Sequence, residues 1–335
     1  MMSWALTNRW IEVKNIIKLC VSVITGNKYF VYRLYSRRGS TTSTIGIFDK
    51  KSIEKFSIVL QGSVLDADYF TIETCKLYRQ LFPDALVILS TWKISDVLKN
   101  NLLDIGVYWI ENEAPENPGI ANINMQITTS REGVLLAKNL GANYVLKTRT
   151  DQRIYHPSLY AYLRNLLNLF PLKNINTRQH ERLIGISMNT LKFRMYGLSD
   201  MFLFGQIDDM ILYWNTPLDP RYDTSEERSN VGKTWKESAI WGIGETYLCT
   251  AFLRKIGYEI QYTLADSFNA ISKHFIVIDA EAIRLYWNKY TFNADRYSAF
   301  GFFNPEISFN DWLMLYENIE TIDIDYSIID QPISQ

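Results

Sequence analysis

The sequence is poor in the residues that build disulfide frameworks and histidine-rich metal centres. Its 335 residues include three cysteines and three histidines. Cys20, Cys75 and Cys249 are odd in number and widely spaced. This argues against a disulfide framework and fits a reducing compartment. Three histidines also rule out a His-rich metal cluster.

Long apolar runs are missing as well. No segment reaches the roughly 18 apolar residues that a membrane span requires. The longest early candidate, residues 16–24, is interrupted by Lys18 and lacks the small-residue cleavage site of a signal peptide. The formal net charge is -1, so no overall basic field points to nucleic acid. We therefore predict a cytoplasmic protein with no nucleic-acid partner.

Charge is unevenly placed along the chain. Residues 1–50 carry an excess of Lys and Arg together with Trp4 and Trp10, whereas no basic residue follows Arg296. The N-terminal segment suits either an interfacial helix at the inner membrane surface or a helix packed on the protein's own surface. The predicted parts are a basic and aromatic extension with a helix over 1–50, a main domain over 51–295, and an acidic and aromatic tail over 296–335 packed on that domain.

From Phe56 onward, apolar strands alternate with helical patterns. The predicted strands and the helices between them cover residues 56–62, 66–81, 85–90, 95–105, 107–110, 122–141 and 144–146. Gly133 is expected to let the third of these helices lie close to a sheet. Each strand is apolar on both faces, which is typical of a parallel sheet with helices on both sides. We predict an α/β fold with an open, mostly parallel, Rossmann-like sheet.

The second half of the chain is less regular. Further strands are predicted at 183–188, 201–205 and 274–278, and further helices at 157–170, 206–214, 244–258 and 280–289. The polar stretch over 215–238 is too long for an ordinary connection. Such a stretch is usually a lid, a binding loop or a disordered segment.

Charge gathers at the end of the strand at 144–146. Lys147, Arg149, Asp151 and Arg153 follow it within seven residues. In open α/β sheets, ligands bind outside the carboxyl ends of the strands. This edge of the sheet is therefore the predicted site.

Several motifs along this sheet are specific enough to indicate a family. They are LQG (60–62), LFPDA (81–85) before VILSTW (87–92), NMQI (124–127) and above all YVLKTRTDQRIY (144–155). Over residues 56–290 the chain resembles the WavE lipopolysaccharide-synthesis family, which belongs with the GT-A type of nucleotide-sugar glycosyltransferases. The resemblance implies a GT-A-like fold. It also implies sugar transfer from a nucleotide-sugar donor to a saccharide or lipid-linked saccharide acceptor. The implied acceptor is a lipopolysaccharide core, an O-antigen or a capsular polysaccharide.

A sugar diphosphonucleotide carries about two negative charges that must be neutralised as its glycosidic bond breaks. By the resemblance, Asp151 would hold a divalent cation, Mn²⁺ or Mg²⁺, and His274 would add a contact to metal or phosphate. Only the second acid of the family's Asp-any-Asp motif is retained, because Arg149 takes the first position. Lys147, Arg149 and Arg153 could instead neutralise the diphosphate directly. The structural alternative for Asp151 is an acid that caps a turn or a helix, and the alternative for His274 is a packed histidine.

Carboxylates are expected in the acceptor site. Glu245, at the start of a predicted helix, resembles the acid that takes a proton from the acceptor hydroxyl in an inverting transferase. Its alternative is an acid that stabilises the helix end. Asp200 is a second candidate for contact with the acceptor.

Four further residues are predicted to contact the donor. Gln61 and Gly62 follow the first strand, and Thr91 follows the second, where the nucleotide base and ribose would lie in such a sheet. Arg131 could reach the diphosphate, or it could make only a surface ion pair.

Two other classes of protein remain open. A sugar nucleotidyltransferase could use a similar sheet, although QGSVLD (61–66) lacks the glycine-rich, basic loop that such enzymes place there. A non-catalytic nucleotide-sugar or glycan-binding module would suit the many Tyr and Trp residues. A Rossmann dehydrogenase lacks support, because no G-x-G-x-x-G follows the first strand.

Overall fold

The computed structural model describes residues 54–65, 69–173, 177–230, 232, 234–288 and 305–318. The elements in chain order are β1 (Phe56–Gln61), α2 (Phe70–Leu81), β2 (Leu86–Thr91), α3 (Asp96–Asp104), β3 (Tyr108–Glu111), η2 (Ile120–Asn122), α4 (Ile123–Asn139), β4 (Tyr144–Arg149), β5 (Gln152–Ile154), α5 (Leu159–Leu169), β6 (Leu183–Ile186), β7 (Leu203–Gln206), α6 (Ile207–Trp214), α7 (Ser225–Ser229), α8 (Trp235–Trp241), α9 (Gly244–Lys255), α10 (Leu264–His274), β8 (Phe275–Ile278), β9 (Leu285–Trp287) and α12 (Phe309–Asn318). The predicted extension over 1–50, with its helix, lies outside the described residues.

A seven-stranded sheet with the order β3-β2-β1-β4-β7-β6-β8 organises these elements. β1 is parallel to β2 and β4, and β2 is parallel to β3. β7 is antiparallel to both β4 and β6, and β6 is parallel to β8. β6 and β8 therefore run in the same direction as β4. The predicted α/β class with a mostly parallel sheet is confirmed.

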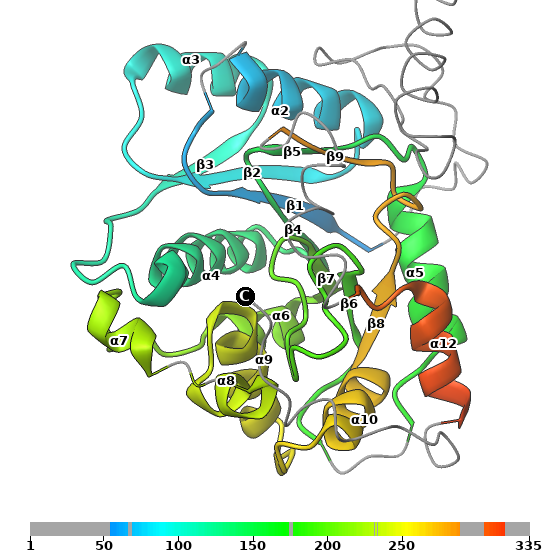
Figure 1. The fold of residues 1–335 in the computed structure, drawn as a ribbon. Helices are drawn as coiled ribbons and strands as arrows, with labels where there is room; N and C mark the ends of the chain where they lie inside the picture. Colours follow the sequence, from blue (N-terminus) through cyan, green and yellow to red (C-terminus); the bar gives the residue numbers. More distant parts are fainter. Residues whose placement is uncertain are drawn as a thin grey trace, which may run out of the picture. The chain divides into compact units, whose positions relative to one another are not determined.

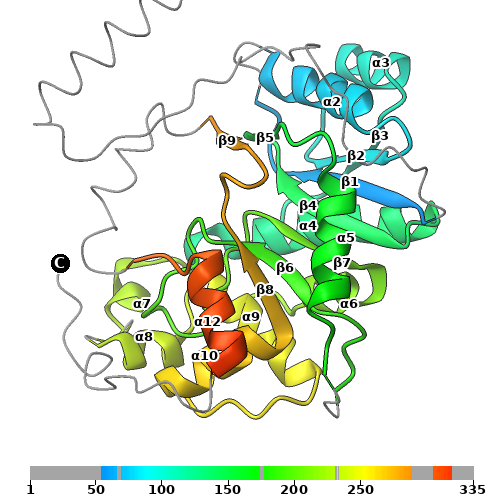
Figure 2. The same cartoon turned by 90° about the vertical axis from the view of Figure 1, so that its right-hand side faces the viewer.

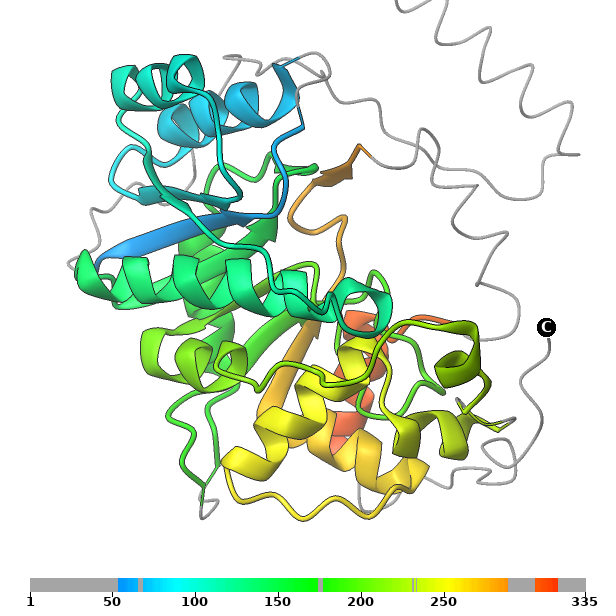
Figure 3. The same ribbon diagram turned by 90° about the vertical axis from the view of Figure 1, so that its left-hand side faces the viewer.

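Helices cover both faces of the sheet. α2 and α3 lie on one side of β1, β2 and β3, and α4 lies on the other (Figure 1). α4 runs close alongside β1 (Figure 3). This close approach depends on Gly133, as predicted, because a Cβ at that position would lie 2.9 Å from the Cβ of Ser90.

Aromatic side chains attach α5 to the sheet. Tyr160 stacks on Phe56 of β1, with 4.8 Å between ring centroids, and lies edge-on to Phe204 of β7 at 6.3 Å. Tyr144 of β4 stacks on Phe204 at 5.8 Å. Phe82, directly after α2, makes an edge contact with Phe56. α5 and α2 therefore share one face of the sheet.

The described part of the C-terminal tail contains α12, which lies beside β8 (Figure 2). Trp312 is fully buried there and donates a hydrogen bond from Nε1 to the carbonyl of Phe275 at 2.9 Å. Its ring also stacks on Phe309 and Tyr316. This helix completes the packing of β8.

Several local predictions differ from the structure. The described residues 280–288 do not form the helix predicted over 280–289: Arg284 adopts a left-handed backbone with φ of 53°, and β9 follows it. The stretch over 215–238 contains the short helix α7 and the first residues of α8. The helix α10 was not predicted. β3 is more exposed than expected, because it is an edge strand with Tyr108 45% exposed.

Among the described residues, no helix combines the length and the apolar character that crossing a bilayer would demand.

Candidate active site

The ends of β1 and β4 form the centre of the candidate site. Gln61 and Arg149 are partners in register at the carboxyl ends of these two parallel strands. Paired residues of neighbouring strands point to the same face of a sheet. Gln61 accepts a hydrogen bond from Thr129 Oγ1 of α4 at 2.7 Å, so this is the face that α4 covers. The charged segment therefore begins at the carboxyl edge of the sheet, on its α4 face.

The Asp151 carboxylate is held from two sides. Arg149 donates from Nε to Oδ1 at 2.9 Å and from its NH2 group to Oδ2 at 3.0 Å. Trp287 Nε1, on β9, donates to Oδ2 at 3.0 Å. Burial alone would raise the pKa of Asp151, but the hydrogen bonds and charge of Arg149, with the indole of Trp287, lower it below its ordinary value. Asp151 is therefore an ionised carboxylate with three of its roughly four acceptor sites in use.

Lys147 lies deeper than Arg149 on the same strand. It is fully buried, donates a hydrogen bond to the carbonyl of Asp200, and places Nζ 4.7 Å from the ring centroid of Trp214. Burial lowers the pKa of Lys147 to about 7. Lys147 therefore does not present its charge to a ligand in solvent.

Arg153 is directed toward α2. It is fully buried and donates to Thr74 Oγ1 at 2.7 Å and to the carbonyl of Phe70 at 3.0 Å, with its guanidinium 4.1 Å from the Phe70 ring centroid. Of the three basic residues predicted to neutralise a diphosphate, Arg149 is the one with an accessible side chain, 25% exposed.

Glu245 lies in the first turn of α9, as predicted. Arg194 approaches its Oε2 at 3.1 Å through NH1, and Asn189 Nδ2 donates to Oε1. Burial raises the pKa of Glu245; the charge of Arg194 opposes this, and the charge of Asp200 adds to it. Glu245 is therefore a carboxylate with increased proton affinity.

Asp200 interacts electrostatically with several of these groups. It precedes β7, whose first residue pairs with Lys147, so it stands at the same edge of the sheet. None of the hydrogen bonds and ion pairs between described residues uses the Asp200 carboxylate. Burial lowers the pKa of Arg149. The hydrogen bond and charge of Asp151, together with the charges of Asp200 and Glu245, outweigh this effect and raise the pKa of Arg149 above its ordinary value. The structure thus brings these four residues into one electrostatic neighbourhood.

The remaining donor candidates next to the strands lie on different faces. Gly62 has φ of 117°, and a Cβ there would lie 3.2 Å from Thr150 Oγ1. Gly62 directly follows Gln61, at the edge described above. Ser90 pairs with Gln61, so Thr91, one residue further, points to the opposite face and is buried there. Thr91 is therefore not brought to the same face as Gln61.

Arg131 lies in α4 and pairs with Glu132, with Nε 3.0 Å from Oε1. Its side chain is partly exposed. This matches the surface ion pair that was one of its two predicted roles.

His274 lies at the other end of the sheet. It ends α10 and precedes β8, which runs in the same direction as β4, so it stands at the amino edge. Asp151 lies seven residues beyond Tyr144 at that edge, roughly 20 Å away along the strand direction. His274 Nδ1 contacts Gln179 Oε1 at 2.8 Å, and burial lowers the pKa of His274 to about 4. The structure does not bring His274 to Asp151, and its placement matches the packed histidine of the structural alternative.

The residues at the carboxyl edge do not fit a divalent cation. Both oxygens of Asp151 already accept hydrogen bonds, and His274 is at the opposite edge. In the described parts of the chain, no three His, Cys, Asp or Glu side chains gather closely enough to hold a metal ion.

Three residues of this site were missed by the sequence-based prediction. They are Asn189, Arg194 and Trp287. Trp287 lies in a stretch predicted as helix, and Asn189 and Arg194 lie in an irregular connection before β7. No spacing or motif in the sequence marks them.

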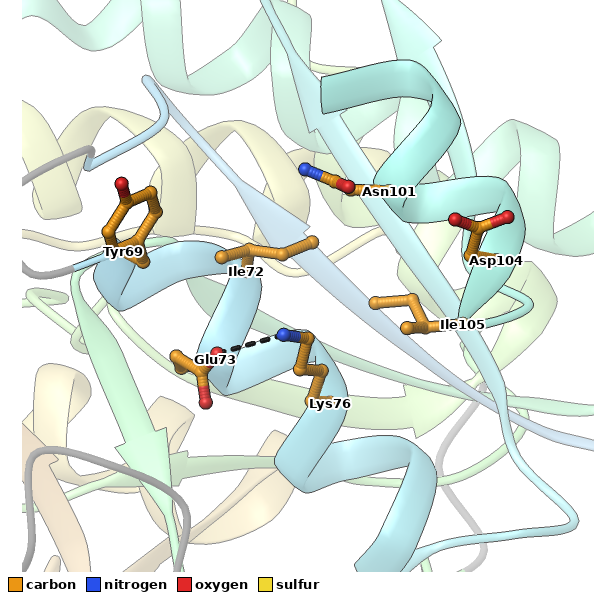
Figure 4. A pocket seen from close by; sticks show the side chains of 7 residues that line it. All are labelled: Tyr69, Ile72, Glu73, Lys76, Asn101, Asp104 and Ile105. Carbon is orange, nitrogen blue, oxygen red and sulfur yellow. Dashed lines mark hydrogen bonds and ion pairs between the residues drawn. The ribbon is translucent and has the colours of Figure 1, made fainter. Parts of the chain in front are cut away.

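A pocket of about 490 Å³ lies between α2 and α3. Its lining residues are Tyr69, Ile72, Glu73, Lys76, Asn101, Asp104 and Ile105 (Figure 4). Glu73 and Lys76 form an ion pair of 2.9 Å on its wall. None of the predicted site residues lines this pocket, so it is a feature distinct from the group at the carboxyl edge.

The fold and the site define an α/β protein with a charged, partly buried group at the carboxyl edge of a mostly parallel sheet. A family model described as WavE lipopolysaccharide synthesis matches residues 56–329. The chain belongs to this family, which confirms the resemblance found in its motifs.

Similarity to solved structures is weak. A protein from Bacillus anthracis assigned as a glucose-1-phosphate thymidylyltransferase, in complex with sucrose, is 12% identical with a TM-score of 0.28, over 49% of this chain and 76% of its own. A mannose-1-phosphate geranyltransferase from Thermus thermophilus is 11% identical with a TM-score of 0.24, over 49% of this chain and 54% of its own. These scores are too low to support an argument. A search of curated proteins finds no match.

Proposed function

We propose that this protein is a GT-A-like glycosyltransferase that moves a sugar from a nucleotide-sugar donor to a lipopolysaccharide core, O-antigen or capsular polysaccharide acceptor. Membership of a lipopolysaccharide-synthesis family supports the setting. The observation that carries the proposal is that Arg149, with an accessible guanidinium, ends β4 at the carboxyl edge of the sheet, where Asp200 precedes the antiparallel strand β7. Glu245 interacts electrostatically with Arg149 and Asp200.

The donor half of the reaction needs a cation at the leaving group. When the glycosidic bond breaks, negative charge develops on the nucleoside diphosphate, and charge-assisted hydrogen bonds from a guanidinium stabilise it. We assign this role to Arg149, whose exposed side chain supports the assignment. Gln61 and Gly62, at the end of the adjacent strand β1, would contact the nucleoside.

The acceptor half needs a base. An acceptor hydroxyl must lose a proton as it attacks the sugar, and a base works best when its pKa lies near the working pH. Burial and the charge of Asp200 move the pKa of Glu245 upward, against the opposing charge of Arg194. Glu245 is therefore proposed as the base and Asp200 as an acceptor contact.

The proposed location is the cytoplasm, with the basic N-terminal segment in contact with the anionic inner face of the membrane. That segment lies outside the described residues, so the support is its composition. Removal of residues 1–40 should reduce partition onto anionic vesicles, measured by sedimentation. Unchanged partition would contradict the contact.

The central test is turnover with a panel of nucleotide sugars, with and without Mn²⁺. Wild-type protein should release nucleoside diphosphate slowly from one donor and faster when a saccharide acceptor is present. Glu245→Gln should keep donor binding and lose transfer by about 10²- to 10⁴-fold. Glu259→Gln, at an exposed acid of the loop after α9, is the matched control.

The alternatives give different outcomes in the same experiment. A sugar nucleotidyltransferase would instead release pyrophosphate from a nucleoside triphosphate and a sugar phosphate. A binding module would bind a nucleotide sugar without turnover. Normal transfer by Glu245→Gln would remove Glu245 from the site.

A further inference from the structure

We propose that the donor diphosphate is bound by Arg149 without a divalent cation, and that Asp151 is a positioning residue that holds the Arg149 guanidinium. This inference rests on the proposed function. It differs from the role that the family resemblance gives to Asp151, which is that of a metal ligand.

The hydrogen bonds of Arg149 leave one side of its guanidinium available. A guanidinium has five N–H donors, and Asp151 takes one from Nε and one from NH2. The donors of NH1 and the second donor of NH2 have no partner among the described residues. Because the side chain is 25% exposed, these donors can meet a ligand. A planar fork with one edge anchored and one edge free suits a phosphate group.

The same geometry disfavours a metal at Asp151. Three of the roughly four acceptor sites of the carboxylate are taken, two on Oδ2 and one on Oδ1. A cation on the remaining Oδ1 site would lie next to the Arg149 guanidinium, which is largely shielded from water, and the two positive charges would repel each other. The other two acids of the neighbourhood do not complete a ligand set with Asp151, as no three metal-binding side chains cluster in the described ranges.

Trp287 supports this arrangement from a separate part of the chain. Its strand β9 pairs with β5, with Gln152 opposite Trp287, and the Asn288 amide donates to the Asp151 carbonyl at 2.9 Å. The indole then holds Asp151 Oδ2, and the Arg149 guanidinium carbon lies 5.8 Å from the indole centroid. Trp287 therefore fixes the orientation in which Asp151 holds Arg149.

The first test measures affinity for UDP, GDP, CDP and ADP by calorimetry, in EDTA and in Mn²⁺ or Mg²⁺ at equal ionic strength. We expect one nucleotide to bind in EDTA with a dissociation constant within about threefold of its value with metal. Binding that disappears in EDTA and returns with Mn²⁺ would overturn this inference and leave the proposed function standing. No binding of any nucleotide under either condition would overturn both.

The second test is a double-mutant cycle on Arg149 and Asp151. Arg149→Lys should weaken nucleotide binding by about tenfold or more, because a lysine keeps the charge and loses the fork. In an Asp151→Asn background the same change should cost much less, because the fork is no longer held. If Asp151 had a purely structural role, the effects of the two changes would be additive. Additive effects would therefore reject the positioning role.

Two further variants make this test specific. Trp287→Phe keeps an aromatic ring and removes the Nε1 donor. It should weaken nucleotide binding several-fold and lower thermal stability only slightly, because Asp151 keeps both hydrogen bonds from Arg149. Asp208→Asn is the matched control, because Asp208 forms an ion pair of 2.8 Å with Lys138 at the start of α6, at the opposite edge of the sheet. It should bind as wild type does. Equal effects of Asp208→Asn and Asp151→Asn would contradict the assignment.

Discussion

Lys147 on β4 donates a hydrogen bond to the backbone carbonyl of Asp200, at the approach to the antiparallel strand β7. Its ammonium lies 4.7 Å from the ring centroid of Trp214, and the side chain is fully enclosed. Burial lowers the pKa of Lys147 to about 7, and the charge of Asp200 only partly opposes this. The two residues thus connect β4 to the segment before β7. This connection is buried, whereas Arg149, two residues further along β4, is accessible.

The lowered pKa of Lys147 predicts a pH-dependent stability. Between pH 7 and its ordinary value of 10.5, the unfolded chain binds the lysine proton more strongly than the folded protein does. The free energy of unfolding should therefore rise with pH in this window, by roughly 1.4 kcal/mol per pH unit from this group. Urea unfolding at pH 7 and pH 9 should show this rise in wild type and a smaller one in Lys147→Met. The exposed Lys138→Met is the control, and parallel pH dependence of wild type and Lys147→Met would contradict the prediction.

A second prediction concerns the acid limb of the pH–rate profile. Burial raises the pKa of Glu245, Arg194 opposes it, and Asp200 raises it further. Asp200→Asn removes one of the raising charges, so the pKa of Glu245 should fall and more of the base should be ionised at low pH. The acid limb of kcat/KM for sugar transfer should then move to lower pH. An acid limb that stays in place, or moves to higher pH, would contradict the role of Asp200.

The alternating strands and helices of the first half were predictable because their signals are local. β1, β2 and β4 each contain a contiguous apolar run, with Gly62 directly after β1 and charged residues at the end of β4, so a local pattern identifies them. β5 and β9 have three residues each and pair across more than a hundred positions of the chain. Strands this short carry no periodic signal, and so neither the pairing nor the position of Trp287 was predictable.

The location of the candidate site was also predictable, but the direction of its side chains was not. The charged segment is contiguous and follows a strand, which is sufficient to place it at the carboxyl edge. Lys147 lies against Trp214 from α6, and Arg153 lies against Phe70 from α2. These contacts depend on tertiary packing. His274 was assigned to the strand because the helix α10 was overlooked, although Thr263 and Asp266 form a local start signal for it.

The close contact of α4 with the sheet predicts the effect of a methyl group at Gly133. A Cβ there would lie 2.9 Å from the Ser90 Cβ, and the surrounding strand residues cannot move freely. Overpacking costs about 1–3 kcal/mol, against a gain of about 1 kcal/mol from helix propensity. Gly133→Ala should therefore lower the free energy of unfolding. Asn139→Ala, at an exposed position of the same helix, should leave it unchanged or raise it slightly, and a stabilising Gly133→Ala would disprove the close contact.

The segment over 215–242 is anchored by Arg221, which predicts a large effect of its removal. Arg221 pairs with Asp219 through Nε at 2.8 Å and NH2 at 2.7 Å, and donates to the carbonyls of Trp241 and Gly242 at the end of α8. Asp219 is 1% exposed, so Arg221→Gln would leave a buried carboxylate without its charge partner. Loss of one partner of a buried pair costs about 3–5 kcal/mol. Urea unfolding should show this loss, and limited proteolysis should cut near α7 and α8 faster.

Arg228 offers a matched control in the same segment. It also pairs with an aspartate, Asp223, but its side chain is 62% exposed. An exposed ion pair is screened by solvent and contributes little to stability, so Arg228→Gln should leave both unfolding and proteolysis close to wild type. If the two arginine variants behave alike, the segment is not held by Arg221.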